Sequence, residues 1–159
     1  MIPRLKGASA VENSVAIGSG ASVVAGSNGS GGVALGNKAH AGYKGTSLGS
    51  DAISGREGAT LVGANTHSGS LYTTVVGTDS VINSDGTTYK AKIYIPFMGT
   101  IEKELNVQGA AATVVGSKNT VDNQNGKVYS GVANNVMGSA NTIEASNWCN
   151  NSGYRQQGY

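Results

Sequence analysis

The sequence has few of the large residues that fill ordinary globular cores, with one phenylalanine and one tryptophan in 159 residues. No apolar run approaches the roughly 20 residues that a membrane-spanning helix needs. The single cysteine, Cys149, excludes a disulfide within the chain. Charged residues make up only 13% of the sequence and the net charge is +2, so no basic stripe predicts a nucleic-acid partner. Helical membrane proteins, disulfide scaffolds and nucleic-acid-binding domains are therefore disfavoured.

The sequence is rich in glycine, with 25 residues, and it repeats one short phrase. Seven times, a run of mostly apolar or β-branched residues ends in a glycine: Gly18, Gly36, Gly49, Gly63, Gly77, Gly116 and Gly138. Such a period is typical of repeat architectures. Helix is disfavoured, because each glycine costs about 1 kcal/mol relative to alanine there. We therefore predict an all-β fold, a parallel β-roll of coils of about 14 residues, stacked about 4.8 Å apart.

The two faces of the strand that precedes each glycine are both free of charge. The residues directly before the glycines are large and apolar, and we predict that they line the inside of the roll: Ile17, Leu35, Leu48, Val62, Val76, Val115 and Met137. The residues two before the glycines are small or apolar, and we predict that they lie at the axis of a trimer: Ala16, Ala34, Ser47, Leu61, Val75, Val114 and Val136. A strand buried on both faces needs a second layer. We expect another copy of the chain to supply it, which predicts an obligate homo-oligomer.

Each coil also contains a weaker second strand, about five residues after its glycine. The middle residues of these strands are predicted to face inward: Val23, Ala41, Ser54, Ser68, Ile82, Val121 and Ile143. The period is broken most strongly between Gly77 and Gly116, where residues 84–109 form an insertion. Alternating residues there predict a β-hairpin that turns near Phe97, with Lys92 opposite Glu102 and Lys90 opposite Glu104.

The phrase from Asn13 to Ala21, NSVAIGSGA, resembles the head repeat of the YadA-like trimeric autotransporter adhesins, and the resemblance continues through the later units. It implies a left-handed parallel β-roll, three chains around one axis, and a stalk with an outer-membrane anchor. It also implies adhesion to a host cell surface or to a matrix protein such as collagen, fibronectin or laminin. On this interpretation the whole chain, 1–159, is one head domain with a tail at 146–159.

No catalytic, cofactor-binding or metal-binding residues emerge from the sequence. His40 and His67 occupy equivalent positions two coils apart, roughly 10 Å, which is too far for one metal ion. Asp51 and Asp79 follow their glycines by two residues, a position that favours a turn role. The candidate ligand contacts are the exposed basic, aromatic and apolar residues of the insertion: Lys90, Lys92, Tyr94, Phe97 and Met98.

The expected function is non-enzymatic adhesion at a bacterial cell surface, facing outward. Residues 1–6 contain too little apolar sequence for a signal peptide, so the chain is expected to be part of a longer secreted protein, anchored through other parts, or else intracellular. One alternative is a rigid spacer or fibre segment with the ligand site elsewhere. Another is a β-solenoid enzyme that acts on carbohydrate. The hairpin has its own alternative, which is packing against a neighbouring chain.

Overall fold

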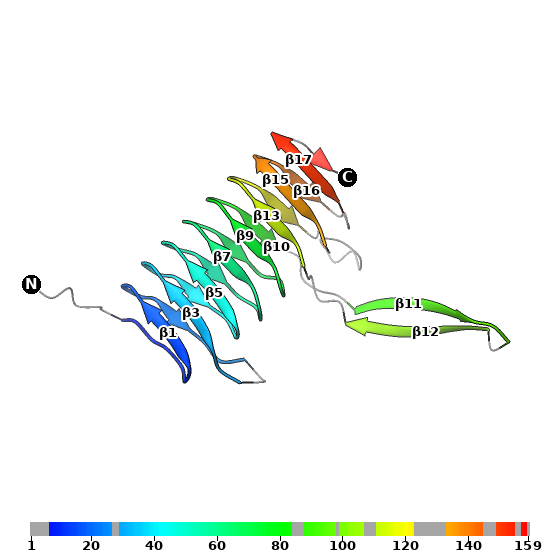
Figure 1. Ribbon diagram of the computed structural model, residues 1–159, viewed down its shortest axis with the longest axis horizontal. Helices are drawn as coiled ribbons and strands as arrows, with labels where there is room; N and C mark the ends of the chain where they lie inside the picture. The colour runs from blue at the N-terminus through cyan, green and yellow to red at the C-terminus, as the bar shows by residue number, and fades with distance from the viewer. Residues whose placement is uncertain are drawn as a thin grey trace, which may run out of the picture.

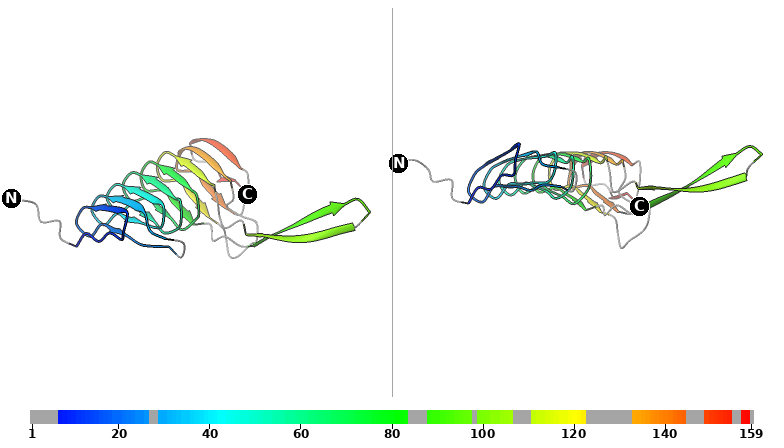
Figure 2. Two further views of the ribbon diagram at one scale, coloured as in Figure 1. Left: turned by 60° about the horizontal axis from the view of Figure 1, so that its bottom comes forward. Right: turned by 90° about the horizontal axis from the view of Figure 1, so that it is seen from below.

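The chain folds as a solenoid of β-strands. The computed structural model describes residues 7–26, 29–83, 88–97, 99–106, 111–122, 133–144, 149–154 and 157–158. Regular structure in these ranges is all β, and each coil contributes one strand to each of two parallel sheets (Figure 1). An antiparallel hairpin, β11 (Thr88–Ile95) and β12 (Gly99–Asn106), extends away from the stack (Figures 1 and 2). The predicted β-roll and the inserted hairpin are confirmed.

Two eight-stranded sheets form the walls of the roll. The first sheet contains β1 (Ser14–Ile17), β3 (Gly32–Leu35), β5 (Gly45–Leu48), β7 (Thr60–Val62), β9 (Thr74–Val76), β13 (Thr113–Val115), β15 (Asn135–Ser139) and β17 (Asn150–Tyr154). The second contains β2 (Ser22–Val23), β4 (His40–Ala41), β6 (Ile53–Ser54), β8 (His67–Ser68), β10 (Val81–Asn83), β14 (Thr120–Asp122), β16 (Thr142–Glu144) and β18 (Gln157–Gly158).

The repeated glycines close the corner between the two sheets, as the repeat predicts. Gly63 has a φ of 133°, and a Cβ atom built on it would lie 1.5 Å from the carbonyl oxygen of Gly77 in the next coil. The same close approach recurs from Gly18 to Gly138 along the stack. Each glycine therefore lacks a side chain because the next coil occupies that space.

The predicted orientation of the first strand is wrong. Ala34, Ser47, Leu61, Val75, Val114 and Val136 are fully buried inside their own roll, and Ala16 packs against the same interior. These residues therefore do not lie at an axis between chains. The residues predicted to be inside instead form an outer ladder on the surface of the first sheet: Ile17, Leu35, Leu48, Val62, Val76, Val115 and Met137.

The thinness of the roll explains this reversal. Each inward residue of the first sheet faces the predicted inward residue of the second sheet, seven positions later in the sequence. All seven of the latter are buried, as predicted. Small side chains face each other at some levels, and Ser47 Oγ lies 3.1 Å from Ser54 Oγ. At another level the large Leu61 faces the small Ser68, so the two single layers fill the narrow space between them in combination. The size of a first-strand residue alone therefore does not decide which face it takes.

The outer corners of the coils require a left-handed backbone conformation. Two residues after each glycine, φ is positive at Gly20, Lys38, Asp51, Asn65, Asp79, Lys118 and Ala140. A corner of the same kind lies five residues before the glycines, at residues such as Asn13, Lys44, Gly58 and Tyr72. The turn role predicted for Asp51 and Asp79 agrees with these positions.

Ala140→Gly is expected to stabilise the roll, because alanine at a φ of 58° carries strain that glycine does not. Glycine also loses more chain entropy on folding, which cancels part of this stabilisation. We expect a net increase in the free energy of unfolding of about 0.5–1 kcal/mol, measured by thermal unfolding. Ala64→Gly is the control, since Ala64 lies in an equivalent turn without a positive φ. A loss of stability in Ala140→Gly would contradict the strain argument.

The segment predicted as a tail contributes another coil where it is described. β17 pairs in parallel with β15, and Gly153, with a φ of 135°, takes the place of the repeated glycine. Cys149 is partly buried against the core, and its backbone N–H donates to Asn134 Oδ1 at 2.9 Å. Gly153 follows Gly138 by 15 residues, but the polar residues before it conceal the repeat.

Candidate functional site

The inserted hairpin has the predicted register. Lys92 pairs with Glu102 and Lys90 with Glu104 on adjacent antiparallel strands. Opposite charges at such positions favour one register over a slipped one. The agreement follows from the period-two alternation of the sequence, which is the same on both strands.

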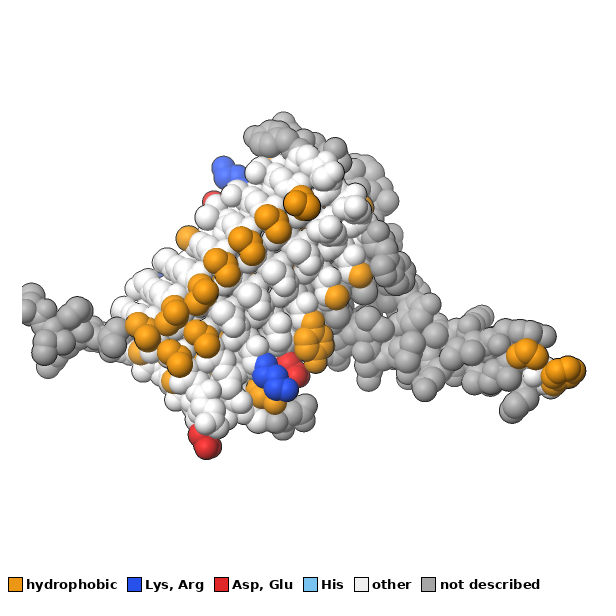
Figure 3. Space-filling view, in the orientation of Figure 1, with side chains coloured by type: hydrophobic (Ala, Val, Ile, Leu, Met, Phe, Trp, Pro, Cys, Tyr) orange, Lys and Arg blue, Asp and Glu red, His pale blue; other side chains and the backbone are white. Residues whose placement is uncertain are grey.

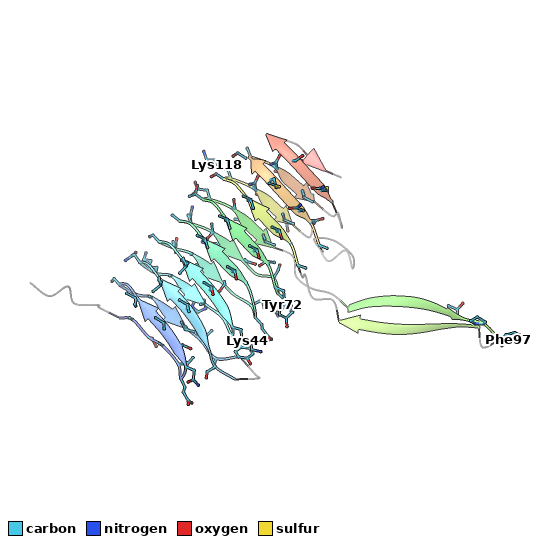
Figure 4. All side chains as sticks on the ribbon, in the orientation of Figure 1. Lys44, Tyr72, Phe97 and Lys118 are labelled. Atoms are coloured by element: carbon cyan, nitrogen blue, oxygen red, sulfur yellow. The ribbon has the colours of Figure 1, made fainter. Side chains whose placement is uncertain are left out.

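The candidate ligand-contact residues lie at two places on the hairpin. Lys90, Lys92 and Tyr94 occupy alternate positions of β11. Phe97 lies in the turn, fully exposed, at the tip labelled in Figure 4. Met98 lies outside the described residues. Three of the five candidates are thus in strand β11, and Phe97 lies at the end of the hairpin.

The outer ladder is the main apolar surface of the first sheet. Its residues are directly paired from strand to strand, Val62 with Val76 and Val76 with Val115, so they form a continuous row. Figure 3 shows a diagonal row of hydrophobic side chains across this face. Ile17 is 50% exposed, Val76 41% and Met137 51%. The parallel row three before each glycine is also uncharged: Val15, Val33, Thr46, Thr60, Thr74, Thr113 and Asn135.

A second group, the edge cluster, lies at the corner that precedes the first-sheet strands and consists of Tyr43, Lys44, Glu57 and Tyr72. Lys44 and Tyr72 appear on the same edge of the roll in Figure 4. The Nζ atom of Lys44 lies 4.8 Å from the centre of the Tyr43 ring and 4.0 Å from Glu57 Oε1. Backbone hydrogen bonds fix the spacing, since Tyr72 N–H donates to the carbonyl of Glu57 at 3.0 Å. Sequence analysis missed this group because its members come from three coils.

The edge cluster contains one positive and one negative side chain, Lys44 and Glu57, whose charges offset each other. The Tyr43 side chain, and more weakly Glu57 and Tyr72, raise the pKa of Lys44 above its ordinary value. Lys44 is therefore a cation throughout the physiological pH range. The nearby Glu57 carboxylate offsets its charge, although an exposed pair of this kind contributes little to stability.

The histidines and aspartates show no shared site. His40 and His67 are separated by Ile53 in the second sheet, and Ser22 Oγ lies 2.7 Å from His40 Nδ1. Asp79 accepts a hydrogen bond from Asn65 Nδ2 at 2.8 Å, between neighbouring corners. Within the ranges that the structure describes, no three potential ligands come together around a metal position.

Comparison with known proteins identifies no family model, curated protein or solved structure that matches this chain. Among the described residues, no helix is long and apolar enough to cross a membrane. The features that bear on function are the repeat, the outer ladder, the edge cluster and the hairpin.

Proposed function

We propose that this chain is the head of a trimeric adhesin of the YadA-like kind, without enzymatic activity, that binds matrix or cell-surface molecules of a host. The observation that carries the proposal is the outer ladder. A continuous apolar row on a soluble surface marks an interaction site, because its contact with water is unfavourable. Because the row recurs in each first-sheet strand from β1 to β15, the same row of another copy can meet it at each of these levels.

Burial of the outer ladder would contribute a substantial part of the free energy of assembly. Burying a half-exposed aliphatic side chain contributes roughly 1 kcal/mol, about half the value for full burial. The seven residues of the ladder then supply on the order of 7 kcal/mol per chain. This contribution is of the same order as the cost of one association event, roughly 4–15 kcal/mol. The apolar row ends at Met137, because the polar Ser152 takes the ladder position in the next strand.

In a trimer, each weak binding site for a host molecule would be present three times. Binding through several identical sites raises overall avidity without a deep pocket. The chain would then lie at a bacterial outer surface, carried by the rest of a longer protein. The alternative is a rigid spacer, which the regular stack of coils also favours, with the ligand site elsewhere in that protein.

The two functions are separated by binding assays on the assembled chain. The chain is tested on immobilised collagen, fibronectin and laminin and on epithelial cells, after light scattering has established its mass. The adhesin proposal predicts saturable binding to at least one of them by a species three times the 15.9 kDa chain. A trimer that binds none of them would favour the spacer.

Deletion of residues 84–109 is expected to reduce that binding at least tenfold if the hairpin carries the ligand contacts. The deletion rejoins two coils whose strands already pair, β9 with β13, so the roll itself is expected to fold. Phe97→Ala and the pair Lys90→Ala/Lys92→Ala test the tip and strand β11 separately. Unchanged binding would remove the hairpin as the site, and a monomeric deletion variant would assign it to packing between chains.

A further inference from the structure

Tyr72 of the edge cluster has a backbone conformation that is unfavourable for a bulky residue. Tyr72 has a φ of 53° and Lys44 one of 52°, at corners where other coils have Asn13, Ala111 or a glycine. Bulky residues are uncommon in this conformation, which costs roughly 1–2 kcal/mol. Asparagine or glycine would form the same corner with less strain. The corner itself therefore does not require a tyrosine.

Tyr72 is arranged as a platform. A Cβ atom built on Gly58 would lie 2.5 Å from Tyr72 Cδ1, so the ring rests directly against the backbone of the preceding coil. Tyr72 as a whole is 55% exposed. Tyr43 differs, since its ring lies against Gly26 and Gly29 of a loop and is only partly accessible. The Tyr72 ring is therefore held in place on one side and is available on the other.

Two polar groups of opposite charge accompany this platform. The Lys44 side chain is 63% exposed and offers N–H donors, while Glu57, 26% exposed, offers carboxylate acceptors. Because the two charges offset each other, the cluster does not select for an anion or a cation. It favours an uncharged partner with an apolar face and several hydroxyl groups.

We propose that the edge cluster is a binding site for an uncharged pyranose unit of a glycan. The C–H face of the sugar stacks on the Tyr72 ring, and its hydroxyl groups hydrogen-bond to Lys44 and Glu57. Aromatic rings with a few placed polar groups are the usual elements of small-ligand recognition. The site lies within one chain, so it does not depend on the proposed trimer or on the hairpin. A single sugar of about twelve heavy atoms is expected to bind with a Kd of about 1–10 mM.

The test uses the full chain and the methyl β-glycosides of glucose, galactose and N-acetylglucosamine. Saturation-transfer NMR detects binding from the ligand, and amide shifts of the protein locate it. We expect at least one glycoside to shift the amides of Lys44, Glu57, Gly58 and Tyr72. No saturable shift at 100 mM of any of the three, or shifts confined to the hairpin, would overturn the proposal.

Substitutions distinguish stacking from a structural role. Tyr72→Ala is expected to lower affinity at least tenfold while preserving the fold, because Ala111 and Ala133 occupy the same corner in later coils. Tyr72→Phe should retain affinity within about threefold, and Glu57→Gln should weaken it several-fold. Lys118→Ala, which removes an exposed side chain at a positive-φ corner on the opposite edge of the roll (Figure 4), is the matched control and should have no effect. If Tyr72→Ala changes the oligomeric mass and leaves sugar binding unaltered, the cluster is a contact between chains and the proposal fails.

Discussion

Val75→Asp is expected to unfold the roll, whereas Val76→Asp, one residue along, is expected to leave it folded and monomeric. Val75 is fully buried between Leu61 and Val114 of the neighbouring strands. An aspartate there would be an unpaired charge in an apolar interior, at a cost of about 3–5 kcal/mol. That loss is a large fraction of the free energy of unfolding of an ordinary domain.

Val76 lies in the outer ladder, so the same substitution has a different consequence. In an isolated chain the new carboxylate is solvated, and the expected change in the free energy of unfolding is within about 0.5 kcal/mol. In the proposed trimer, three aspartates would meet in an apolar contact without partners. Assembly is therefore expected to be lost.

Light scattering measures the mass of the two variants, and circular dichroism measures their β-structure. The unchanged chain should have three times the chain mass, Val76→Asp should have β-structure at the mass of one chain, and Val75→Asp should lose β-structure. Thr74→Asp, on the same face in the adjacent row, measures how far the contact extends. A folded monomer from the unchanged chain would contradict the trimer, and a trimer of Val76→Asp would contradict the role of the outer ladder.

Gly63→Ala is expected to destabilise the stack by about 3–5 kcal/mol. The added methyl group would meet the backbone carbonyl of Gly77, which the coil cannot move without shifting its own hydrogen bonds. The φ of 133° adds strain, because that conformation is almost restricted to glycine. The melting temperature should fall by about 6–20 °C, since each kcal/mol shifts it by about 2–4 °C in a chain of this length.

Gly20→Ala is the matched control for this effect. Gly20 also has a positive φ, 69°, but the atom closest to an added Cβ is the side-chain Cγ of Lys38, at 3.7 Å. Alanine there carries only the conformational cost, about 1–2 kcal/mol. If the two variants melt alike, close approach between coils is not what requires glycine in the repeat.

The sequence predicts the path of the chain well, because the same geometric demand recurs in every coil. Repeated glycines locate the corners, and β-branched residues between them predict the strands. The hairpin register follows from complementary alternation on its two strands. These features are local, and each can be recognised without knowledge of what packs against it.

The faces of the first strand could not be assigned from residue size alone. Val75 and Val76 are alike, and at Leu61 and Val62 the larger residue faces inward. The interior limits the combined size of two facing residues seven positions apart, such as Leu61 with Ser68, and that limit can be applied only after the two sheets have been placed together. The edge cluster was not predicted because it depends on the stacking of coils, which brings Lys44, Glu57 and Tyr72 together.

The parallel hydrogen bonds between coils also determine how the roll responds to mechanical load. β1 and β17 lie at opposite ends of the first sheet, so tension between the chain ends acts along the stack. A terminal coil is held by the bonds to a single neighbour and can peel away before the others. Each released coil of about 14 residues lengthens the chain by roughly 50 Å. A single roll under tension is thus expected to unfold coil by coil from its ends. Association of several rolls along their whole length would hold the terminal coils in place and oppose this unfolding.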